Sequence, residues 1–375
     1  MEAALYLHVP FCRGKCPYCD FYSVTEPPDE SLYLSAVLAE VRLWRERIPR
    51  KTVFVTFYAG GGTPSLLSPD FYARLFEELS RLLSFSPVEL TLEANPEGLS
   101  LKRLEGYLRA GFNRLSLGLQ SLQPEGLLAL GRRHGPEEAR AAVEAARRAG
   151  FENLSLDFIF GWPGETPAHL QKDLDEALRL APEHLSWYEL TPEEGTPLFR
   201  ALAEGRVRLP GEEVLVDMHR TIHERLTGEG FEHYEISNYA RPGRRCLHNL
   251  FYWKALPYLG LGPAAASFLG KRRYRNPEDL KTYLSTVRSG TLAARLEEVL
   301  SPEEALREAV ILSLRLSEGV RRKEFRRRFG RDPLESFSKE IKDLERKGLV
   351  EADEEGFRLT FAGRLLANQV QLHFV

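Results

Sequence analysis

Apolar and β-branched runs of five to seven residues alternate along the first half of the chain with longer segments whose apolar residues recur at helical spacing. A run of the first kind is typical of a buried strand, and the helical spacing is typical of an amphipathic helix. Regular alternation of the two favours an α/β fold with a parallel sheet. The predicted strands are 5–9, 52–58 and 88–93, and the predicted helices are 29–47, 71–83 and 101–109.

A longer pattern repeats with a period near 40 residues. The sequence AGFNRLSL at 110–117 returns as AGFENLSL at 149–156, and looser copies occupy 180–190 and 230–236. Each copy combines a helix end, a glycine suited to a C-cap and a strand, which indicates parallel βα units. We predict about six units before the pattern fades near residue 240, in a partial TIM-like barrel. On pattern alone a doubly wound sheet is the alternative.

The composition changes after residue 240. Turn-forming residues at 238–245 predict a linker, and Ser301 followed by Pro302 predicts a helix start. Helices ending near 316, at 322–329 and at 334–346, followed by a hairpin over 348–360, describe a winged-helix-like α+β module. The predicted division is a barrel over 1–240, a linker region over 241–295 and the C-terminal module over 296–375.

Composition and charge narrow the class of protein. The chain has 375 residues, 43% hydrophobic and 28% charged, with a net charge of −3, so nucleic acid is not the expected main partner. A local group of arginines between 321 and 331 raises nucleic-acid binding as a rival, but acidic residues are interspersed. We expect a cytoplasmic protein, because no signal peptide or membrane-length apolar run is present and four cysteines make no disulfide framework.

Three of these four cysteines, Cys12, Cys16 and Cys19, lie within eight residues directly after the first predicted strand. Soft thiolates select an iron–sulfur cluster, zinc or copper(I). A cubane cluster takes four ligands, so three thiolates would leave one iron open. The alternatives are a zinc site completed by Cys246 or a histidine, and surface thiols without a role.

Polar residues gather where the predicted strands end. Three successive glycines follow the second strand and allow either a close approach of a ligand or a tight turn. Ligands bind at this end of parallel barrels, so the residues there are site candidates, although each alone could be a helix cap. The candidates are Gly60, Gly61, Gly62, Thr63, Glu93, Gln120, Asp157, Tyr188 and Glu189.

The CxxxCxxC loop, with Tyr18 before its last cysteine, resembles the cluster loop of the radical S-adenosylmethionine (SAM) enzymes. The flanking Tyr6-x-His8-x-Pro10-Phe11 resembles the oxygen-independent coproporphyrinogen III oxidases and their relatives, and the similarity of motifs extends to Asn368. The resemblance implies a [4Fe-4S] cluster on the three cysteines, with the open iron on SAM. It further implies that SAM is held by Tyr6, Tyr18, Gly60, Gly61, Gly62, Thr63, Glu93, Gln120, Arg132 and Asp157.

Two departures from the oxidases point to a sister group, the HemW-type heme chaperones. Phe21 stands where the oxidases have a further cysteine, and His248-Asn249-x-x-Tyr252-Trp253 matches an HNxxYW motif that the oxidases lack. The resemblance implies that His248, Asn249, Tyr252 and Trp253 bind heme, with His248 favoured over Cys246 as ligand. An amphipathic capping segment is the alternative for this stretch.

Two functions stay open at this point. The first is a heme chaperone that binds the cluster, SAM and heme and delivers heme to respiratory apo-proteins, with transient membrane-protein contact. The second is an oxygen-independent coproporphyrinogen III oxidase, which makes protoporphyrinogen IX by oxidative decarboxylation. Only five residues precede Tyr6, whereas the oxidases carry a longer N-terminal extension, which favours the chaperone. The sequence leaves open whether the protein is an enzyme.

Overall fold

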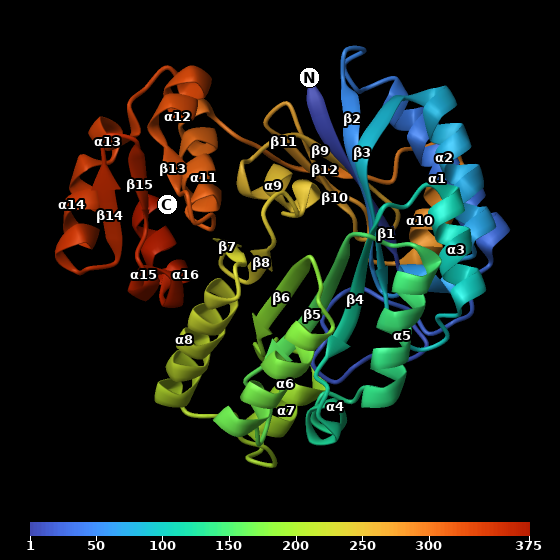
Figure 1. Cartoon of the computed structure of the whole chain (residues 1–375). Coiled ribbons are helices and arrows are strands. Elements are labelled where there is room, and N and C mark those ends of the chain that lie inside the picture. Colours follow the sequence, from blue (N-terminus) through green and yellow to red (C-terminus); the bar gives the residue numbers. More distant parts are fainter.

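A mixed sheet of 12 strands forms the main body of the protein, as a computed structural model of all 375 residues shows (Figure 1). Its centre consists of six parallel strands connected by helices. These elements are β1 (Glu2–Val9), α1 (Glu30–Arg45), β2 (Val53–Gly61), α2 (Pro69–Leu82), β3 (Ser84–Ala94), α3 (Leu101–Ala110), β4 (Arg114–Gln120), α5 (Pro136–Ala149), β5 (Leu154–Phe160), α6 (Pro167–Arg179) and β6 (His184–Glu189).

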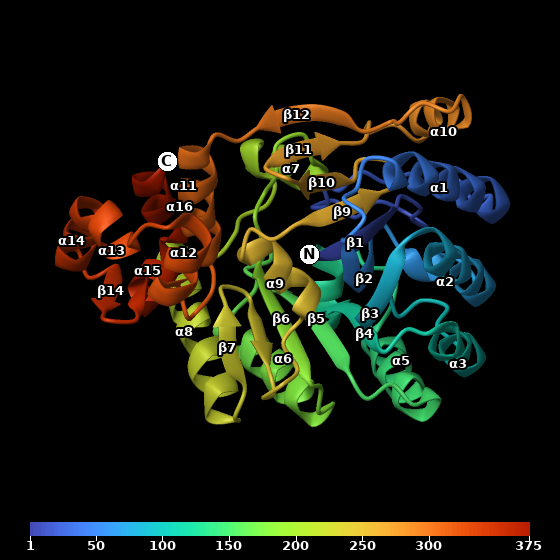
Figure 2. The same cartoon turned by 90° about the horizontal axis from the view of Figure 1, so that it is seen from above.

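Strands β1 to β6 lie side by side in chain order, and every neighbouring pair is parallel. The connecting helices cover the outer side of the curved sheet (Figure 2). A doubly wound sheet would reverse its strand order at a switch point, so that alternative is wrong and the α/β fold class is confirmed. The sheet is open, with β12 and β7 at its edges. Its description as a partial barrel stays a prediction.

The repeated AGF phrase marks the helix ends as predicted. Gly111 and Gly150 follow α3 and α5 with φ of 116° and 106°, values that glycine adopts without strain. The next residues, Phe112 and Phe151, are buried in the main core. Each phenylalanine therefore fixes the helix end against the strand that follows it.

The last copy of the phrase, at 230–236, does not form a parallel unit. It gives β7 (Glu232–Glu235), which pairs antiparallel with β8 (Asn238–Ala240), and β8 in turn pairs antiparallel with β6. No helix separates β7 from β8, so the chain cannot make the crossover that a parallel neighbour needs. The helix that precedes β7 is α8 (Glu212–Gly228).

Most of the stretch 241–295 is folded onto the main body, so the predicted linker is wrong in that respect. Strand β9 (Tyr258–Leu261) pairs with β1, whose other side already pairs with β2. Strand β1 is therefore hydrogen-bonded on both edges. Leu259 and Leu261 of β9 extend the main core on this side of β1. The other elements here are α9 (Leu247–Trp253), β10 (Ala266–Leu269), β11 (Arg272–Arg275), α10 (Leu280–Arg288) and β12 (Arg295–Val299).

The C-terminal region has a hydrophobic core of its own with 14 buried residues. The third helix predicted here is interrupted at Phe337, and the first ends at Ser313 rather than 316. The division of the chain into three domains stays a prediction. The elements are α11 (Pro302–Ser313), β13 (Val320–Arg321), α12 (Arg322–Phe329), α13 (Pro333–Ser336), α14 (Ser338–Arg346), β14 (Val350–Asp353), β15 (Gly356–Leu359), α15 (Phe361–Leu365) and α16 (Ala367–Gln371).

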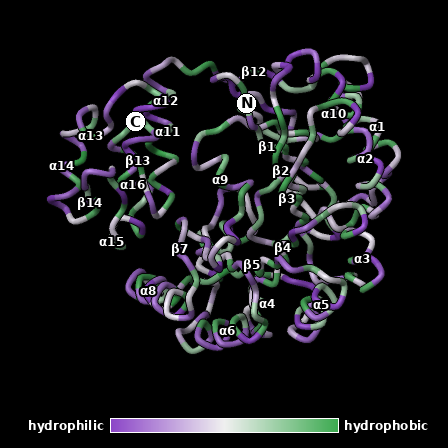
Figure 3. The backbone as a smooth tube through the Cα atoms, turned by 45° about the horizontal axis from the view of Figure 1, so that its top comes forward, coloured by the Kyte–Doolittle hydropathy of each residue, from purple (hydrophilic) through white to green (hydrophobic).

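The arginine-rich segment of this region is partly neutralised by ion pairs. Asp332 pairs with Arg322 at 2.7 Å and with Arg326, and Arg331 pairs with Glu303 at 2.7 Å. Hydrophilic and hydrophobic residues alternate along the chain instead of forming long runs (Figure 3). Accordingly, none of the helices is both long and apolar enough to span a bilayer.

Candidate functional site

The inner face of the parallel sheet is polar, whereas its outer face is apolar. In β4, Leu115, Leu117 and Leu119 are buried in the main core, while Arg114, Ser116, Gly118 and Gln120 line a cavity of about 620 Å³. Successive side chains of a strand point to opposite faces, so this period of two places every second residue inside. Strands β3, β5 and β6 contribute Glu93, Asn95, Asp157, Ile159, His184, Ser186 and Tyr188 in the same way.

The thiol loop forms one side of this cavity. Cys12, Cys16 and Cys19 line it and are half-buried. The two ends of the loop are joined, because the Cys12 backbone N–H donates to the Val24 carbonyl at 2.9 Å. The Pro17 carbonyl in turn accepts from the Leu198 N–H at 2.9 Å. The loop is thus fixed by the protein itself.

Two of the three glycines after the second strand are required where β2 meets the thiol loop. Gly61 has a φ of +107°, and a Cβ there would lie 2.7 Å from the His8 ring. A Cβ on Gly62 would lie 2.7 Å from the Phe11 carbonyl oxygen and 3.1 Å from Cys12 Sγ. Glycine therefore allows the end of β2 to approach the thiols more closely than any other residue could.

A chain of polar contacts connects two of the cysteines across the cavity. Cys12 Sγ lies 3.6 Å from Thr63 Oγ1, which accepts a hydrogen bond from Asn95 Nδ2 at 3.2 Å. Asn95 Oδ1 accepts from Arg132 Nη2 at 2.5 Å, and Arg132 Nη1 donates to Cys16 Sγ at 3.5 Å. Sequence reasoning missed Asn95, although it lies two residues after Glu93 and hence on the same face of β3.

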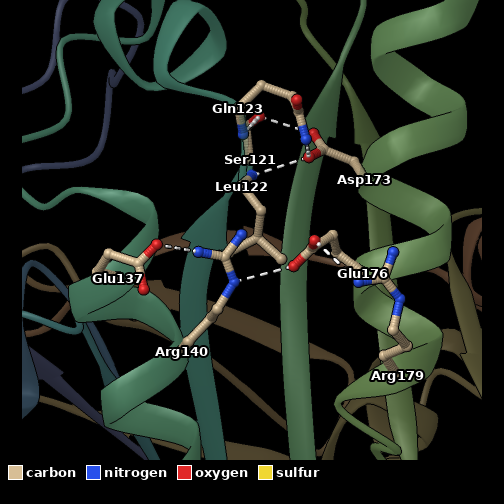
Figure 4. A network of polar contacts seen from close by, with 8 residues as sticks. All are labelled: Ser121, Leu122, Gln123, Glu137, Arg140, Asp173, Glu176 and Arg179. Carbon is tan, nitrogen blue, oxygen red and sulfur yellow. Dashed lines mark hydrogen bonds and ion pairs between the residues drawn. The ribbon is translucent and has the colours of Figure 1, made fainter.

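Gln120 ends β4 in a backbone conformation that is unusual for its type, with a φ of 67°. The following residues are held by Asp173 of α6 (Figure 4). Its carboxylate accepts hydrogen bonds from Ser121 Oγ at 2.6 Å, the Leu122 N–H at 2.9 Å and Gln123 Nε2 at 3.0 Å. These bonds hold the loop in place and so fix the left-handed residue at the cavity wall.

Two carboxylates reach the cavity below the thiols. Burial raises the pKa of Glu93 to about 7, and its Oε1 accepts from the Tyr58 hydroxyl at 2.7 Å. Burial also raises the pKa of Asp157, which accepts from the hydroxyls of Ser116, Ser155 and Ser186 at 2.8, 3.0 and 2.7 Å. The sequence predicted Asp157 near the end of its strand. Asp157 instead lies in the middle of β5, because β5 continues to Phe160.

The structure brings most of the predicted SAM and cluster residues together and leaves a minority outside the cavity. Among the outside residues, Tyr6 stacks on Tyr58, and its hydroxyl lies 3.2 Å from His8 Nδ1. Further cavity residues that sequence reasoning did not assign are Tyr58, Asn95, Glu97, Arg114, Ser116, His184 and Ser186. The predicted residues that line the cavity are Cys12, Cys16, Tyr18, Cys19, Gly61, Gly62, Thr63, Glu93, Gln120, Arg132, Asp157, Tyr188, Glu189 and Asn249, whereas Gly60 does not line it.

The HNxxYW motif forms helix α9, and His248 is fully buried in it. Its Nδ1 lies 2.9 Å from Thr56 Oγ1 and its Nε2 lies 2.8 Å from the Tyr252 hydroxyl, so both ring nitrogens have protein partners. Burial lowers the pKa of His248 to about 3, which keeps the ring neutral. In this arrangement neither nitrogen is free to bind iron.

The rest of α9 is anchored in a similar way. Glu89 of β3 accepts from the backbone N–H groups of Leu247 and His248 at 3.0 and 2.9 Å, which caps the helix from a distant strand. The guanidinium of Arg315 lies over the Trp253 ring at 4.4 Å. Of the four motif residues only Asn249 lines the cavity.

Cys246 lies apart from the loop thiols. It is fully buried, and its Sγ donates to Glu89 Oε1 at 3.7 Å. It does not line the cavity that the three loop thiols face, so the zinc site completed by Cys246 is not formed.

Comparison with known proteins places these features in a family. The model of the Radical SAM superfamily matches residues 6–177, and that of the HemN C-terminal domain matches residues 300–366. The chain is similar to coproporphyrinogen III oxidase (HemN) from Escherichia coli, a structure with 25% identity and a TM-score of 0.84 that covers 100% of this chain and 90% of that one.

Curated relatives are closer in sequence. The heme chaperone HemW of Bacillus subtilis is 36% identical over 97% of both chains. HemW of Escherichia coli is 40% identical over 70% of this chain and 69% of its own. A mitochondrial radical S-adenosyl methionine domain-containing protein of Danio rerio is 31% identical over 99% of this chain and 86% of its own. Similarity at this level along the whole chain shows that the protein belongs to the HemW heme chaperone family within the radical SAM superfamily.

Proposed function

We propose that the protein is a heme chaperone that holds a [4Fe-4S] cluster on Cys12, Cys16 and Cys19, binds SAM beside it, and delivers heme to respiratory proteins. The observation that carries the proposal is the similarity to heme chaperones over nearly the full chain, together with Phe21 and α9 at the two positions that depart from the oxidases. We place this activity in the cytoplasm, with respiratory apo-proteins as acceptors and transient contact with membrane proteins.

The thiol loop fits a cluster. Three half-buried thiols face one cavity, and the absence of a Cβ at Gly62 leaves room beside Cys12 Sγ. The Arg132 guanidinium donates to Cys16 Sγ, which places a cation beside one of the three sulfur atoms that would bind iron. When bound, the cluster would supply an electron to SAM.

The residues below the thiols fit SAM. Glu93 and Asp157 can accept hydrogen bonds from an ammonium or from ribose hydroxyls, and the Arg132 guanidinium can pair with a carboxylate. The edge formed by Gly61 and Gly62 lets a ligand backbone approach β2 closely. Gly61 and Glu93 lie at the ends of their strands, where parallel barrels bind their ligands, and Asp157 lies deeper, in the middle of β5.

A heme titration of the anaerobically reconstituted protein tests the proposal. We expect saturable, stoichiometric binding, followed by absorption, and transfer of the bound heme to an apo-cytochrome. A protein that binds heme only weakly and without saturation would contradict a chaperone function.

The alternative is an oxygen-independent coproporphyrinogen III oxidase. The likeness to the HemN structure over all of this chain favours it, because the fold and the HemN C-terminal domain are shared. The same preparation, incubated with SAM, a reductant and coproporphyrinogen III, separates the two. Formation of protoporphyrinogen IX would support the oxidase, and its absence alongside heme binding would support the chaperone.

A further inference from the structure

Arg114 is a buried cation without a protein partner. It is the first residue of β4, only 2% of it is exposed, and it lines the cavity. Its Nε is buried without a hydrogen-bond partner, and the Glu89 carboxylate acts on its charge from beyond direct contact. An unpaired N–H donor of a cation in a protein interior is costly, so such a group is normally satisfied by something in the space that it faces.

The neighbouring polar groups are already engaged with one another. Glu89, the buried carboxylate on the adjacent strand, accepts from two backbone N–H groups of α9 and from Cys246 Sγ. Asp157 accepts from three serine hydroxyls. His184 lies 2.8 Å from Ser155 Oγ and 2.8 Å from the Tyr234 hydroxyl. Glu89 and Asp157 are thus bonded to other groups, and neither forms a direct ion pair with Arg114.

A second free donor comes from a different element. Asn249 of α9 lines the same cavity and is half-buried, and its side-chain amide makes no hydrogen bond to the protein. Glu89 fixes the orientation of α9 through the N–H groups of the two residues before Asn249. Two donors on separate, anchored elements therefore face one enclosed space.

Arg114 lies deeper in the cavity than the residues expected to hold SAM. Arg114 pairs in register with Thr91, two residues before Glu93, which corresponds to about 7 Å along the strand. Gln120 lies at the opposite end of β4, about 20 Å from Arg114. The space near Arg114 is thus a separate level of the cavity, which we call the cavity floor (Arg114, Asn249).

We infer that the cavity floor is a binding site for a carboxylate group. A guanidinium presents two parallel N–H donors that match the two carboxylate oxygens, and the Asn249 amide can add a third bond. Two sources share this chemistry. One is a propionate side chain of heme, which rests on the proposed function, and the other is a small free carboxylate.

The test uses the anaerobically reconstituted full-length protein with propionate as the first probe. We expect sodium propionate to raise the midpoint of thermal unfolding in a saturable manner beyond sodium chloride of equal ionic strength. Arg114→Gln should abolish this rise, and Arg114→Lys, which keeps the charge but not the planar fork, should keep part of it. Arg109→Gln on the exposed side of α3 is the matched control and should respond like the parent.

The second arm identifies the source. If heme supplies the carboxylate, Arg114→Gln should weaken heme binding at least tenfold, while heme dimethyl ester, which lacks free carboxylates, should bind the parent and the variant alike. If the propionate response depends on Arg114 but heme binding does not, the source is a small carboxylate. A parent that fails to bind heme but keeps an Arg114-dependent propionate response would reject the proposed function and retain the site.

One result overturns the inference: a propionate response in Arg114→Gln equal to that of the parent. Should this variant not fold, Asn249→Asp answers the same question, because it places a carboxylate in the cavity that Arg114 faces and should remove the propionate response. A full response in Asn249→Asp would equally reject the site.

Discussion

The two motifs that identify the family are presented in opposite ways. The thiol loop is open: its three cysteines are half-buried and line the cavity. Helix α9 is closed: His248 is fully buried, and the polar atoms of its ring are bonded to Thr56 and Tyr252. The thiol loop presents its sulfur atoms to the cavity, whereas both ring nitrogens of His248 are hydrogen-bonded within the protein.

Helix α9 is held at both ends by different parts of the molecule. Glu89 of the main sheet caps its N-terminus, and Arg328 of the C-terminal region donates to the carbonyl of Lys254 at 2.5 Å just after its end. Lys254 also pairs with Glu318 at 3.3 Å. The contrast teaches that a motif can be diagnostic of a family while some of its residues, here His248 and Tyr252, are bonded within the protein.

The largest effect is expected at the open motif. Cys16→Ala removes one of three thiolates and should abolish the visible absorbance and the iron content after anaerobic reconstitution. Cys246→Ala is the matched control, because Cys246 lies in the closed region, and should retain full iron. Equal iron in the two variants would mean that the loop thiols do not hold the metal.

At the closed motif, Glu89→Ala should destabilise the protein without removing iron. The change leaves two backbone N–H groups at the start of α9 unpaired, of which that of His248 is buried, and we expect a loss of about 2–4 kcal/mol. Denaturant unfolding measures it, with the surface variant Glu297→Gln as control. A loss below that of the control would show that the cap is replaceable.

A smaller loss of stability is expected for His248→Ala, within helix α9. It removes two buried hydrogen bonds and should cost about 2–3 kcal/mol, and Tyr252→Phe, which removes only the bond to Nε2, about 1 kcal/mol. The absorption maximum of bound heme should be the same in parent and His248→Ala. A shifted maximum would show that α9 opens and that His248 binds iron, as the family resemblance implies.

The smallest effect concerns pH. The pKa of Glu93 is raised from 4.5 to about 7 in the folded protein. As the pH falls, Glu93 therefore takes up its proton near pH 7 in the folded protein but only near pH 4.5 in the unfolded chain. Glu93 thus contributes less to stability above pH 7 than below it, and Glu93→Gln should remove that difference.

The ionised form of Glu93 attracts an ammonium group, so SAM affinity should rise a few-fold between pH 6 and pH 8, by about 1 kcal/mol at most. Equilibrium dialysis checks this, and Glu93→Gln should give a flat profile. Glu40 has a similar pKa of about 7 but is buried against Asn276 and Tyr283, so Glu40→Gln should keep the slope. A slope that survives in Glu93→Gln would assign the titration to another group.

The sequence predicted helix ends and strand positions correctly where they depend on residues that are close together in the chain. Ser301 caps α11 as predicted, with Glu304 completing the capping box, and Gly111 and Gly150 end their helices. The strand positions, the helices between them and the close spacing of the three thiols belong to the same class. Each depends on residues within one or two turns of chain, so the sequence alone determined them.

The tertiary structure decided what those elements face. Thr56 and His248 are 192 residues apart, and no local pattern relates them. Arg114 and Asn95 face the cavity because of strand register, and a slip of one residue would turn each to the outer face. The pairing of β9 with β1 likewise brings a predicted linker into the core. Which polar groups are free and which are already bonded follows from these distant pairings, since each hydrogen bond within 3.5 Å needs both partners placed by the fold.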